Sequence, residues 1–146
     1  LITKIQNQGT FNQGFMTTEL LAAALLDMEL HNLTDTENLN VVAFEKETMD
    51  KLGLIPEIAP RYRATYFSHI IGGYAAGYYS YLWAEVLDTD AFEAFKEHGV
   101  FDKNTADSFR KNILEKGGTE DPMTLYRGFR GADPSLEPLL KNRGLK

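Results

Sequence analysis

Apolar residues recur at helical spacing near the start of the chain, between Phe15 and Leu33. They stand three or four positions apart: Leu20, Leu21, Ala24, Leu25 and Met28. This spacing gathers side chains on one side of a helix, so it predicts a helix over the whole stretch. The polar run Asn32–Asn38 interrupts the pattern and predicts the end of that helix.

A second helix is predicted after this break. Asp35 or Thr36 can cap its start, since both side chains accept hydrogen bonds from backbone N–H groups. The apolar pattern continues to about Leu52, where Gly53 is placed to end the helix. The following stretch, Leu54–Pro60, contains two prolines and favours an extended connection.

The middle of the chain is rich in aromatic residues. Arg61–Ile71 contains tyrosine, phenylalanine and histidine, and Gly72 and Gly73 then interrupt the pattern. A long apolar and aromatic segment follows. It predicts one helix from Tyr74 to His98, with Gly99 as its stop.

Three shorter helices are predicted in the last third of the chain. Their expected ranges are Asn104–Lys116, Asp121–Phe129 and Ser135–Asn142. Asp121 is expected at the N-cap and Pro122 at the first helical position, a pairing that suits the start of a helix. The alternation typical of strands is weak throughout. The predicted fold class is therefore all-α, an irregular helical bundle.

The composition fits a soluble globular protein, with 43% apolar and 25% charged residues among 146. The 15 basic and 21 acidic residues give a net charge of −6 without a basic stripe, which argues against nucleic acid as a partner. The absence of cysteine excludes disulfides and thiolate metal sites, and it fits a reducing compartment such as the cytoplasm. The longest apolar run, Leu20–Leu26, has seven residues and is too short to span a membrane.

The chain opens at Leu1, without a methionine and within a stretch that already has a structured pattern. We therefore expect a fragment of a longer protein, whose missing N-terminal part is one of its partners. Helices that pack on absent neighbours would expose apolar surface. Self-association of the fragment through that surface is expected.

The candidate chemistry is concentrated in the segment Tyr66–Val86. It holds five of the seven tyrosines: Tyr66, Tyr74, Tyr78, Tyr79 and Tyr81. An uncharged phenol can donate a hydrogen bond to a developing oxyanion, a contact worth about 3 kcal/mol in a dry cleft. On a helix, Tyr74, Tyr78 and Tyr81 would share one face. A glycine pair before such a face suits a loop that closes over a ligand.

The same residues also have ordinary structural explanations. Tyrosines at helical spacing commonly pack in a core, and a glycine pair commonly marks a turn. A single histidine such as His69 commonly makes an interior hydrogen bond. The residue pattern alone leaves both interpretations open.

A resemblance to a known family bears on this choice. The string from His69 to Trp83, HIIGGYAAGYYSYLW, resembles the glycine–tyrosine loop of the thimet oligopeptidase and peptidyl-dipeptidase family of zinc metallopeptidases. Pro60–Arg63 resembles the bacterial dipeptidyl carboxypeptidase branch. Further similar motifs follow in order along essentially the whole chain: Phe11–Phe15, Glu19–Asp27, Phe109–Arg110, Gly117–Gly118, Asp121–Pro122, Leu125–Tyr126, Phe129–Gly131 and Arg143–Leu145.

The resemblance implies a helical, two-lobed enzyme that cuts short peptides, with release of C-terminal dipeptides expected. In that family a His-Glu-x-x-His helix and a later glutamate hold zinc, and the glutamate inside the motif acts as general base. This chain has three histidines, His31, His69 and His98, none of them followed by glutamate or spaced by four. The zinc-binding segment is therefore expected upstream. The fragment alone is expected to bind no zinc and to be inactive.

The resemblance also implies roles for single residues. Tyr81 would donate to the oxyanion of the tetrahedral intermediate, and His69 would assist as a second hydrogen-bonding group. Tyr74 and Tyr78 would contact the peptide, and Tyr79 would pack. Three glycines would give the loop its mobility: Gly72, Gly73 and Gly77.

Two weaker candidates come from the residues themselves. Asp27 and His31 are four positions apart on one helix and could bind a metal, although a local ion pair is commoner. Arg61 and Arg63 could attract the carboxylate of a peptide, although exposed salt bridges would explain them as well. The alternative function is a standalone helical module that binds a peptide or a protein through its aromatic face.

Overall fold

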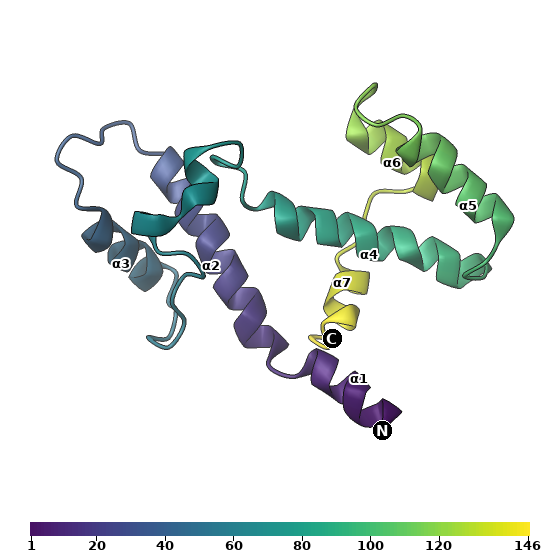
Figure 1. The fold of residues 1–146 in the computed structure, drawn as a ribbon, viewed down its shortest axis with the longest axis horizontal. Coiled ribbons are helices and arrows are strands. Elements are labelled where there is room, and N and C mark those ends of the chain that lie inside the picture. The colour runs from purple at the N-terminus through teal and green to yellow at the C-terminus, as the bar shows by residue number, and fades with distance from the viewer. The chain divides into compact units, whose positions relative to one another are not determined.

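The computed structural model describes all 146 residues and contains helices but no strand, which confirms the predicted all-α class (Figure 1). The chain divides into two compact units, Leu1–Leu82 and Trp83–Lys146. The α-helices are α1 (Ile2–Thr10), α2 (Gln13–His31), α3 (Val41–Lys51), α4 (Ser80–His98), α5 (Lys103–Phe109), α6 (Pro122–Arg130) and α7 (Glu137–Asn142).

The helix α2 is the longest element of the first unit and confirms the helix predicted from Phe15 to Leu33. Its buried residues lie between positions 22 and 27 and include three alanines: Ala22, Ala23, Ala24, Leu26 and Asp27. Leu21 and Leu25, which made the pattern helical, remain partly exposed. Small side chains on the buried side leave room for bulky aromatic rings from another part of the chain.

The start of α3 differs from the prediction. Asn40 caps this helix, because its side-chain oxygen accepts the backbone N–H three residues ahead at 3.0 Å. Asp35 instead accepts the backbone N–H two residues ahead at 2.8 Å and forms a local turn, and Thr36 lies outside the helix. The predicted stop is confirmed, since Gly53 adopts a left-handed conformation with φ +67°.

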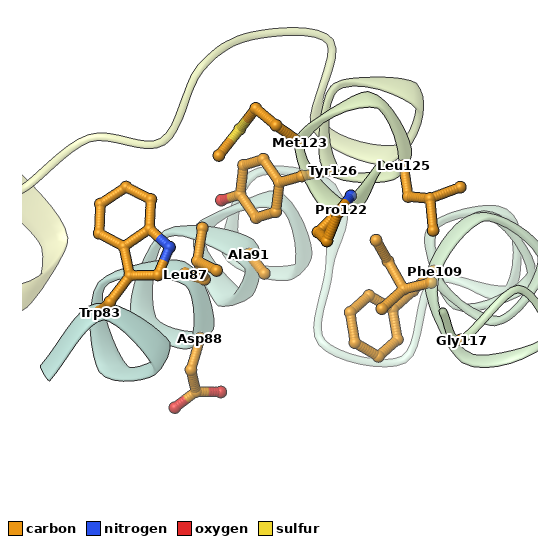
Figure 2. A pocket seen from close by; sticks show the side chains of 11 residues that line it. Trp83, Leu87, Asp88, Ala91, Phe109, Gly117, Pro122, Met123, Leu125 and Tyr126 are labelled. Atoms are coloured by element: carbon orange, nitrogen blue, oxygen red, sulfur yellow. The ribbon is translucent and has the colours of Figure 1, made fainter. Parts of the chain in front are cut away.

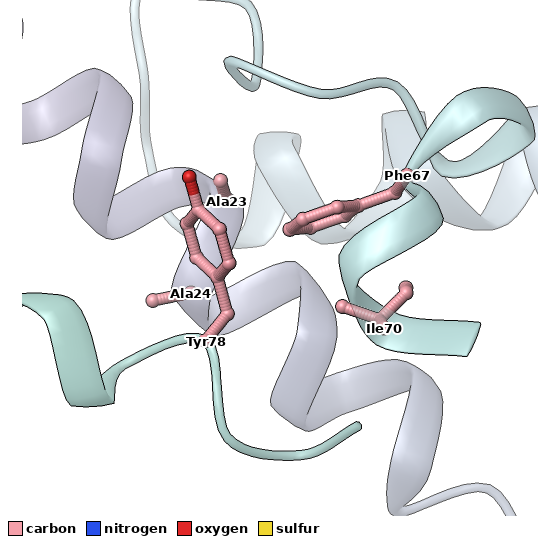
Figure 3. Packing of buried hydrophobic residues seen from close by; sticks show 5 residues of the cluster. All are labelled: Ala23, Ala24, Phe67, Ile70 and Tyr78. Carbon is pink, nitrogen blue, oxygen red and sulfur yellow. The ribbon is translucent and has the colours of Figure 1, made fainter. Parts of the chain in front are cut away.

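The core of the first unit joins α2 to a segment that contains two short 3₁₀ turns, Ala64–Tyr66 and Ser68–Ile71, and the residues after them. Its buried members are Ala23, Ala24, Phe67, Ile70 and Tyr78 (Figure 3). The ring of Phe67 is fully buried and meets the ring of Tyr78 edge-on at 4.8 Å. Aromatic pairs in this arrangement are favourable beyond their buried area.

The helix predicted to begin at Tyr74 begins only at Ser80, so that part of the prediction is wrong. The residues before it form successive turns, and Ala76 has a positive φ of 53°. The N–H groups of Ala76 and Tyr78 donate to the side chain of Asp27 at 2.9 Å. Because those two N–H groups bond outside the segment, they do not make the hydrogen bonds of an α-helix.

The second unit follows the local signals of its sequence. Asp102 caps α5 and Asp121 caps α6, each by accepting the backbone N–H three residues ahead, at 2.7 and 2.9 Å. Pro122 stands at the start of α6 as predicted. The predicted helix Asn104–Lys116 is also present, but its second half, Arg110–Leu114, is a π-helical turn.

Polar contacts, one of them buried, tie α4 to α6 within the second unit. The Tyr126 hydroxyl donates to Asp90 Oδ2 at 2.5 Å, and Arg130 binds Glu97 through two N–H groups at 2.7 and 3.0 Å. Burial, together with the bond to Asp90, raises the pKa of Tyr126. None of the helices in the chain combines the length and apolar character needed to cross a lipid bilayer.

The Phe67 ring gives a direct test of the first core. Replacing it in Phe67→Ala leaves a cavity, so the free energy of unfolding should fall by about 3–5 kcal/mol. Urea unfolding followed by circular dichroism measures this loss. The matched control is Phe101→Ala, because Phe101 is 99% exposed and should change stability little. Equal losses in the two variants would contradict the assigned core.

Exposed apolar side chains predict self-association. The helix α1 buries no residue, and Ile2 and Ile5 on it are exposed. Burial of such side chains in a second molecule would stabilise a dimer or larger species. Sedimentation velocity over a concentration series should show a mass that rises with concentration. A single monomeric species at high concentration would contradict this expectation.

Candidate functional site

The aromatic rings of the first unit converge on His69. We define this aromatic cluster by its six members: Tyr62, Phe67, His69, Tyr74, Tyr78 and Tyr81. The His69 ring lies 4.6 Å from Tyr62, 5.4 Å from Tyr78 and 6.3 Å from Tyr81, measured between ring centroids. Tyr74 stacks on Tyr81 at 5.3 Å. Four residues singled out by the sequence therefore meet in one place.

The three tyrosines meet through a turn and not through a helix face. Tyr74 and Tyr78 lie in the turns before α4, whereas Tyr81 lies in its first turn. The single helical face predicted from their spacing is therefore wrong, although their proximity is confirmed. The rings of Tyr78 and Tyr81 are 5.1 Å apart.

Exposure divides the tyrosines into two groups. Tyr78 is only 3% exposed and lies against Ala23 and Ala24 of α2 (Figure 3). This structure therefore gives Tyr78 no surface for direct contact with a peptide, because its ring belongs to the core. Tyr74 and Tyr81 are 45% and 43% exposed and can meet a ligand. Tyr79, expected to pack, is exposed.

The phenols of Tyr78 and Tyr81 keep their protons. Burial raises the pKa of Tyr78 above its ordinary value of 10.0. A side-chain hydrogen bond with Tyr74, aided by burial, raises the pKa of Tyr81 as well. A phenol with a raised pKa stays neutral at physiological pH and can donate a hydrogen bond.

The imidazole of His69 has an unmet hydrogen-bonding position. Its Nδ1 is buried among the rings of the aromatic cluster and has no hydrogen-bond partner within the chain. A buried polar atom without a partner is uncommon in folded proteins, because it loses the bond it would make to water. Such an atom gains from a partner supplied by another molecule or by another part of a protein.

None of the three glycines of the segment has a positive φ. Gly72, Gly73 and Gly77 all have φ outside the left-handed region, which in this segment is occupied by Ala76. A Cβ at Gly72 or Gly73 would point into open space. The mobility that the family resemblance implies for these glycines stays a prediction.

Asp27 has a structural role that the sequence pattern did not predict: it binds the backbone of a distant segment. It is 0% exposed, and its two oxygens accept the backbone N–H groups of Ala76 and Tyr78, both at 2.9 Å. His31 Nδ1 lies 2.9 Å from one of the same oxygens. The signal that could have revealed this role is an acidic residue directly after the apolar run Leu20–Leu26, because a carboxylate buried with such a run needs hydrogen-bond partners.

The metal-binding hypothesis for Asp27 and His31 does not fit this geometry. Both carboxylate oxygens are already bonded to backbone N–H groups, and His31 Nδ1 faces the same carboxylate. No group of three or more His, Asp or Glu side chains gathers anywhere in the chain. Zinc needs about four ligands, three of them from protein in catalytic sites, so the donors of this chain do not fit a zinc centre.

The two arginines considered for carboxylate binding differ. Arg63 pairs with the buried carboxylate of Glu45, so the salt-bridge explanation holds for it. Arg61 makes no ion pair, and its guanidinium lies 6.0 Å from the ring centroid of Tyr62. Arg61 therefore keeps its charge available beside the aromatic cluster.

A separate apolar pocket lies in the second unit (Figure 2). It has a volume of about 330 Å³ and is lined mainly by residues of α4, the π-helical turn and α6, among them Trp83, Leu87, Ile113 and Tyr126. No member of the aromatic cluster lines it. The pocket is therefore distinct from the aromatic cluster, which holds the residues singled out by the sequence.

Comparison with known proteins gives consistent matches. The sequence model of peptidase family M3 matches residues 1–145. The dipeptidyl carboxypeptidases of Escherichia coli K12 and Salmonella typhimurium are 44% and 42% identical to this chain, each over 97% of it. Oligopeptidase A of Haemophilus influenzae is 38% identical over 99% of it. The chain spans 21% of the length of each of these relatives.

The raised pKa of Tyr78 predicts a loss of stability in alkali. The folded chain holds this proton more tightly than the unfolded chain, whose tyrosine has the ordinary pKa of 10.0. The resulting stability is complete below pH 10.0 and is lost as the pH rises through the folded-state pKa. Urea unfolding across this pH range should show that the free energy of unfolding falls less steeply with pH in Tyr78→Phe than in the unmodified chain. Tyr79→Phe is the matched control for removal of a hydroxyl, and equal slopes for Tyr78→Phe and the unmodified chain would contradict the prediction.

Proposed function

We propose, since this chain belongs to peptidase family M3, that it is the C-terminal, substrate-binding part of a longer zinc metallopeptidase that hydrolyses short peptides. Relatives that carry peptidase names match nearly the whole chain, and the chain spans 21% of their length. In this proposal, two parts of the longer protein supply different catalytic groups. This part supplies neutral hydrogen-bond donors and contact surface, and the rest of the protein supplies the zinc and the general base.

The exposed phenol of Tyr81 is the observation that carries the proposal. It lies in the first turn of α4, 43% exposed, within 6.3 Å of His69 by ring centroids. Hydrolysis of a peptide bond places negative charge on the carbonyl oxygen in the tetrahedral intermediate. A positioned neutral O–H stabilises that oxygen more than it stabilises the uncharged carbonyl, which lowers the barrier.

His69 and Tyr74 complete the proposed surface. Tyr74 is 45% exposed and stacks on Tyr81, so a peptide that reaches the oxyanion donor also touches Tyr74. The His69 ring lies 6.3 Å from each of these rings, and its unpartnered Nδ1 is a position for a hydrogen bond in the assembled enzyme. Tyr78 supports the ring of Tyr81 from the core side.

Release of C-terminal dipeptides is the finer part of the proposal. The relatives carry two names, dipeptidyl carboxypeptidase and oligopeptidase A, with identities of 44% and 38%. Arg61 supports the first activity, because a cation without an ion-pair partner can bind the carboxylate of a peptide. Cleavage inside longer peptides is the alternative outcome of the same assay.

Tyr81→Phe in the longer protein tests the oxyanion role. Loss of one oxyanion donor should lower kcat by about 100- to 1,000-fold with little change in KM, because the bond forms mainly in the transition state. Hydrolysis of a fluorogenic peptide in the presence of zinc measures this effect. Tyr79→Phe is the matched control, since it removes an exposed hydroxyl two residues away.

Three outcomes would count against the proposal. An unchanged kcat in Tyr81→Phe would remove Tyr81 from the oxyanion role. Hydrolysis by the 146-residue chain alone would contradict the division of labour. Peptide binding without hydrolysis in the longer protein would favour the binding-module alternative.

A further inference from the structure

We infer that Asp27 is the positioning residue of the aromatic cluster. Its buried carboxylate fixes the backbone of the segment Gly72–Tyr79, and through it the rings of Tyr78 and Tyr81. The consequence for catalysis rests on the proposed function, whereas the structural anchoring of the segment does not.

The contacts of Asp27 form a two-point clamp. Oδ1 accepts the N–H of Ala76 and Oδ2 accepts the N–H of Tyr78, each at 2.9 Å, from residues 49 and 51 positions along the chain. Two N–H groups that converge on one carboxylate fix the backbone on both sides of Gly77. An ordinary ion pair with His31 would need only one of the two oxygens and no distant segment.

The conformation of Ala76 depends on this clamp. Its φ of 53° places an alanine in the left-handed region, which disfavours residues that carry a Cβ. The residues around it have a pattern that favours extension of α4 toward Tyr74. Hydrogen bonds to Asp27 remove two N–H groups from that competing helix and stabilise the turn.

The backbone of this segment determines where the rings lie. Tyr78 receives the second bond of the clamp, and its ring meets Phe67 at 4.8 Å and Tyr81 at 5.1 Å. Tyr81 follows three residues later, at the start of α4. A change in the turn therefore moves the ring of Tyr81 relative to His69.

His31 contacts the same carboxylate from within α2. Its Nδ1 lies 2.9 Å from Asp27 Oδ1 and 2.8 Å from the backbone oxygen of Asp27 on the same helix. Asp27 thus has a partner in α2 and two partners in the distant segment. This arrangement leaves neither carboxylate oxygen without a hydrogen bond.

Glu45 offers a matched control in the same unit. It is also a helix residue with a buried carboxylate, and it accepts the backbone N–H of Ala64 at 2.7 Å while pairing with Arg63. It therefore anchors a loop to a helix as Asp27 does. No hydrogen bond of Glu45 reaches the segment Gly72–Tyr79, so Glu45→Gln separates general loss of stability from loss of the clamp.

Amide hydrogen exchange on the 146-residue chain tests the anchoring. In Asp27→Asn, one oxygen becomes an amide donor, so exchange at Ala76 and Tyr78 should accelerate at least about tenfold relative to the amides of α2. Glu45→Gln should leave the ratio of the exchange rates at Ala76 and Tyr78 to those of the α2 amides unchanged. Equal ratios in Asp27→Asn and the unmodified chain would overturn the inference.

A second measurement needs no substitution. Scalar couplings across hydrogen bonds, from the carboxylate carbon of Asp27 to the amide nitrogens of Ala76 and Tyr78, report the clamp in the unmodified chain. Their detection supports the inference. Their absence, in a spectrum that resolves the equivalent coupling between Glu45 and Ala64, would overturn it.

A double-substitution cycle in the longer enzyme tests the catalytic consequence. Misplacement of a group by ~1 Å can lower a rate by up to about 100-fold, so Asp27→Asn should lower kcat about tenfold. The same change in a Tyr81→Phe background should lower kcat less than about threefold, because Asp27 acts through Tyr81. Glu45→Gln should have the same effect in both backgrounds.

The outcomes separate the two proposals. If Tyr81→Phe lowers kcat but the effect of Asp27→Asn is equal in both backgrounds, the positioning role is overturned and the proposed function stands. If Tyr81→Phe leaves kcat unchanged, the proposed function fails. Amide exchange then still decides whether Asp27 anchors the segment.

Discussion

The first unit is organised around one carboxylate that has been taken out of water. Burial of a carboxyl group is unfavourable unless its oxygens are hydrogen-bonded, and Asp27 is fully buried. Its partners are two N–H groups that lie about fifty positions away along the chain. The helix α2 therefore reaches its stable packing only when the segment before α4 adopts the observed turn.

The core and the candidate site consequently overlap at Phe67 and Tyr78. Tyr78 is a core side chain by burial and a neighbour of Tyr81 by contact. Ala23 and Ala24 matter because their small side chains let the aromatic rings approach α2 closely. The site is thus supported by a packed helix, although its exposed members come from turns and from a helix end.

Local chemistry made much of the fold predictable from the sequence. The N-cap at Asp121, the proline at the first helical position and the stop at Gly53 depend on neighbouring residues only, and all three are confirmed. The failures have two causes. The late start of α4 depends on Asp27, a distant hydrogen-bond acceptor that no local spacing reveals, and the cap of α3 was one of several polar residues that could serve equally well.

In the candidate site, too, the features set by neighbouring residues were predictable and those set by distant contacts were not. The clustering of His69, Tyr74, Tyr78 and Tyr81 was predictable because aromatic residues crowded into a short segment tend to pack together, and the structure brings them together. Which of these rings would be buried was not predictable, because burial depends on the alanines of α2. The partnership between Asp27 and the turn required the folded chain.

The left-handed conformation of Ala76 has an evolutionary consequence. Glycine at this position would adopt the same conformation without strain, and the turn would then depend less on its carboxylate anchor. Alanine makes the two positions mutually dependent. Across the relatives of this chain, drift at the position of Asp27 should therefore be tolerated mainly where glycine has replaced Ala76, and the two positions should change together.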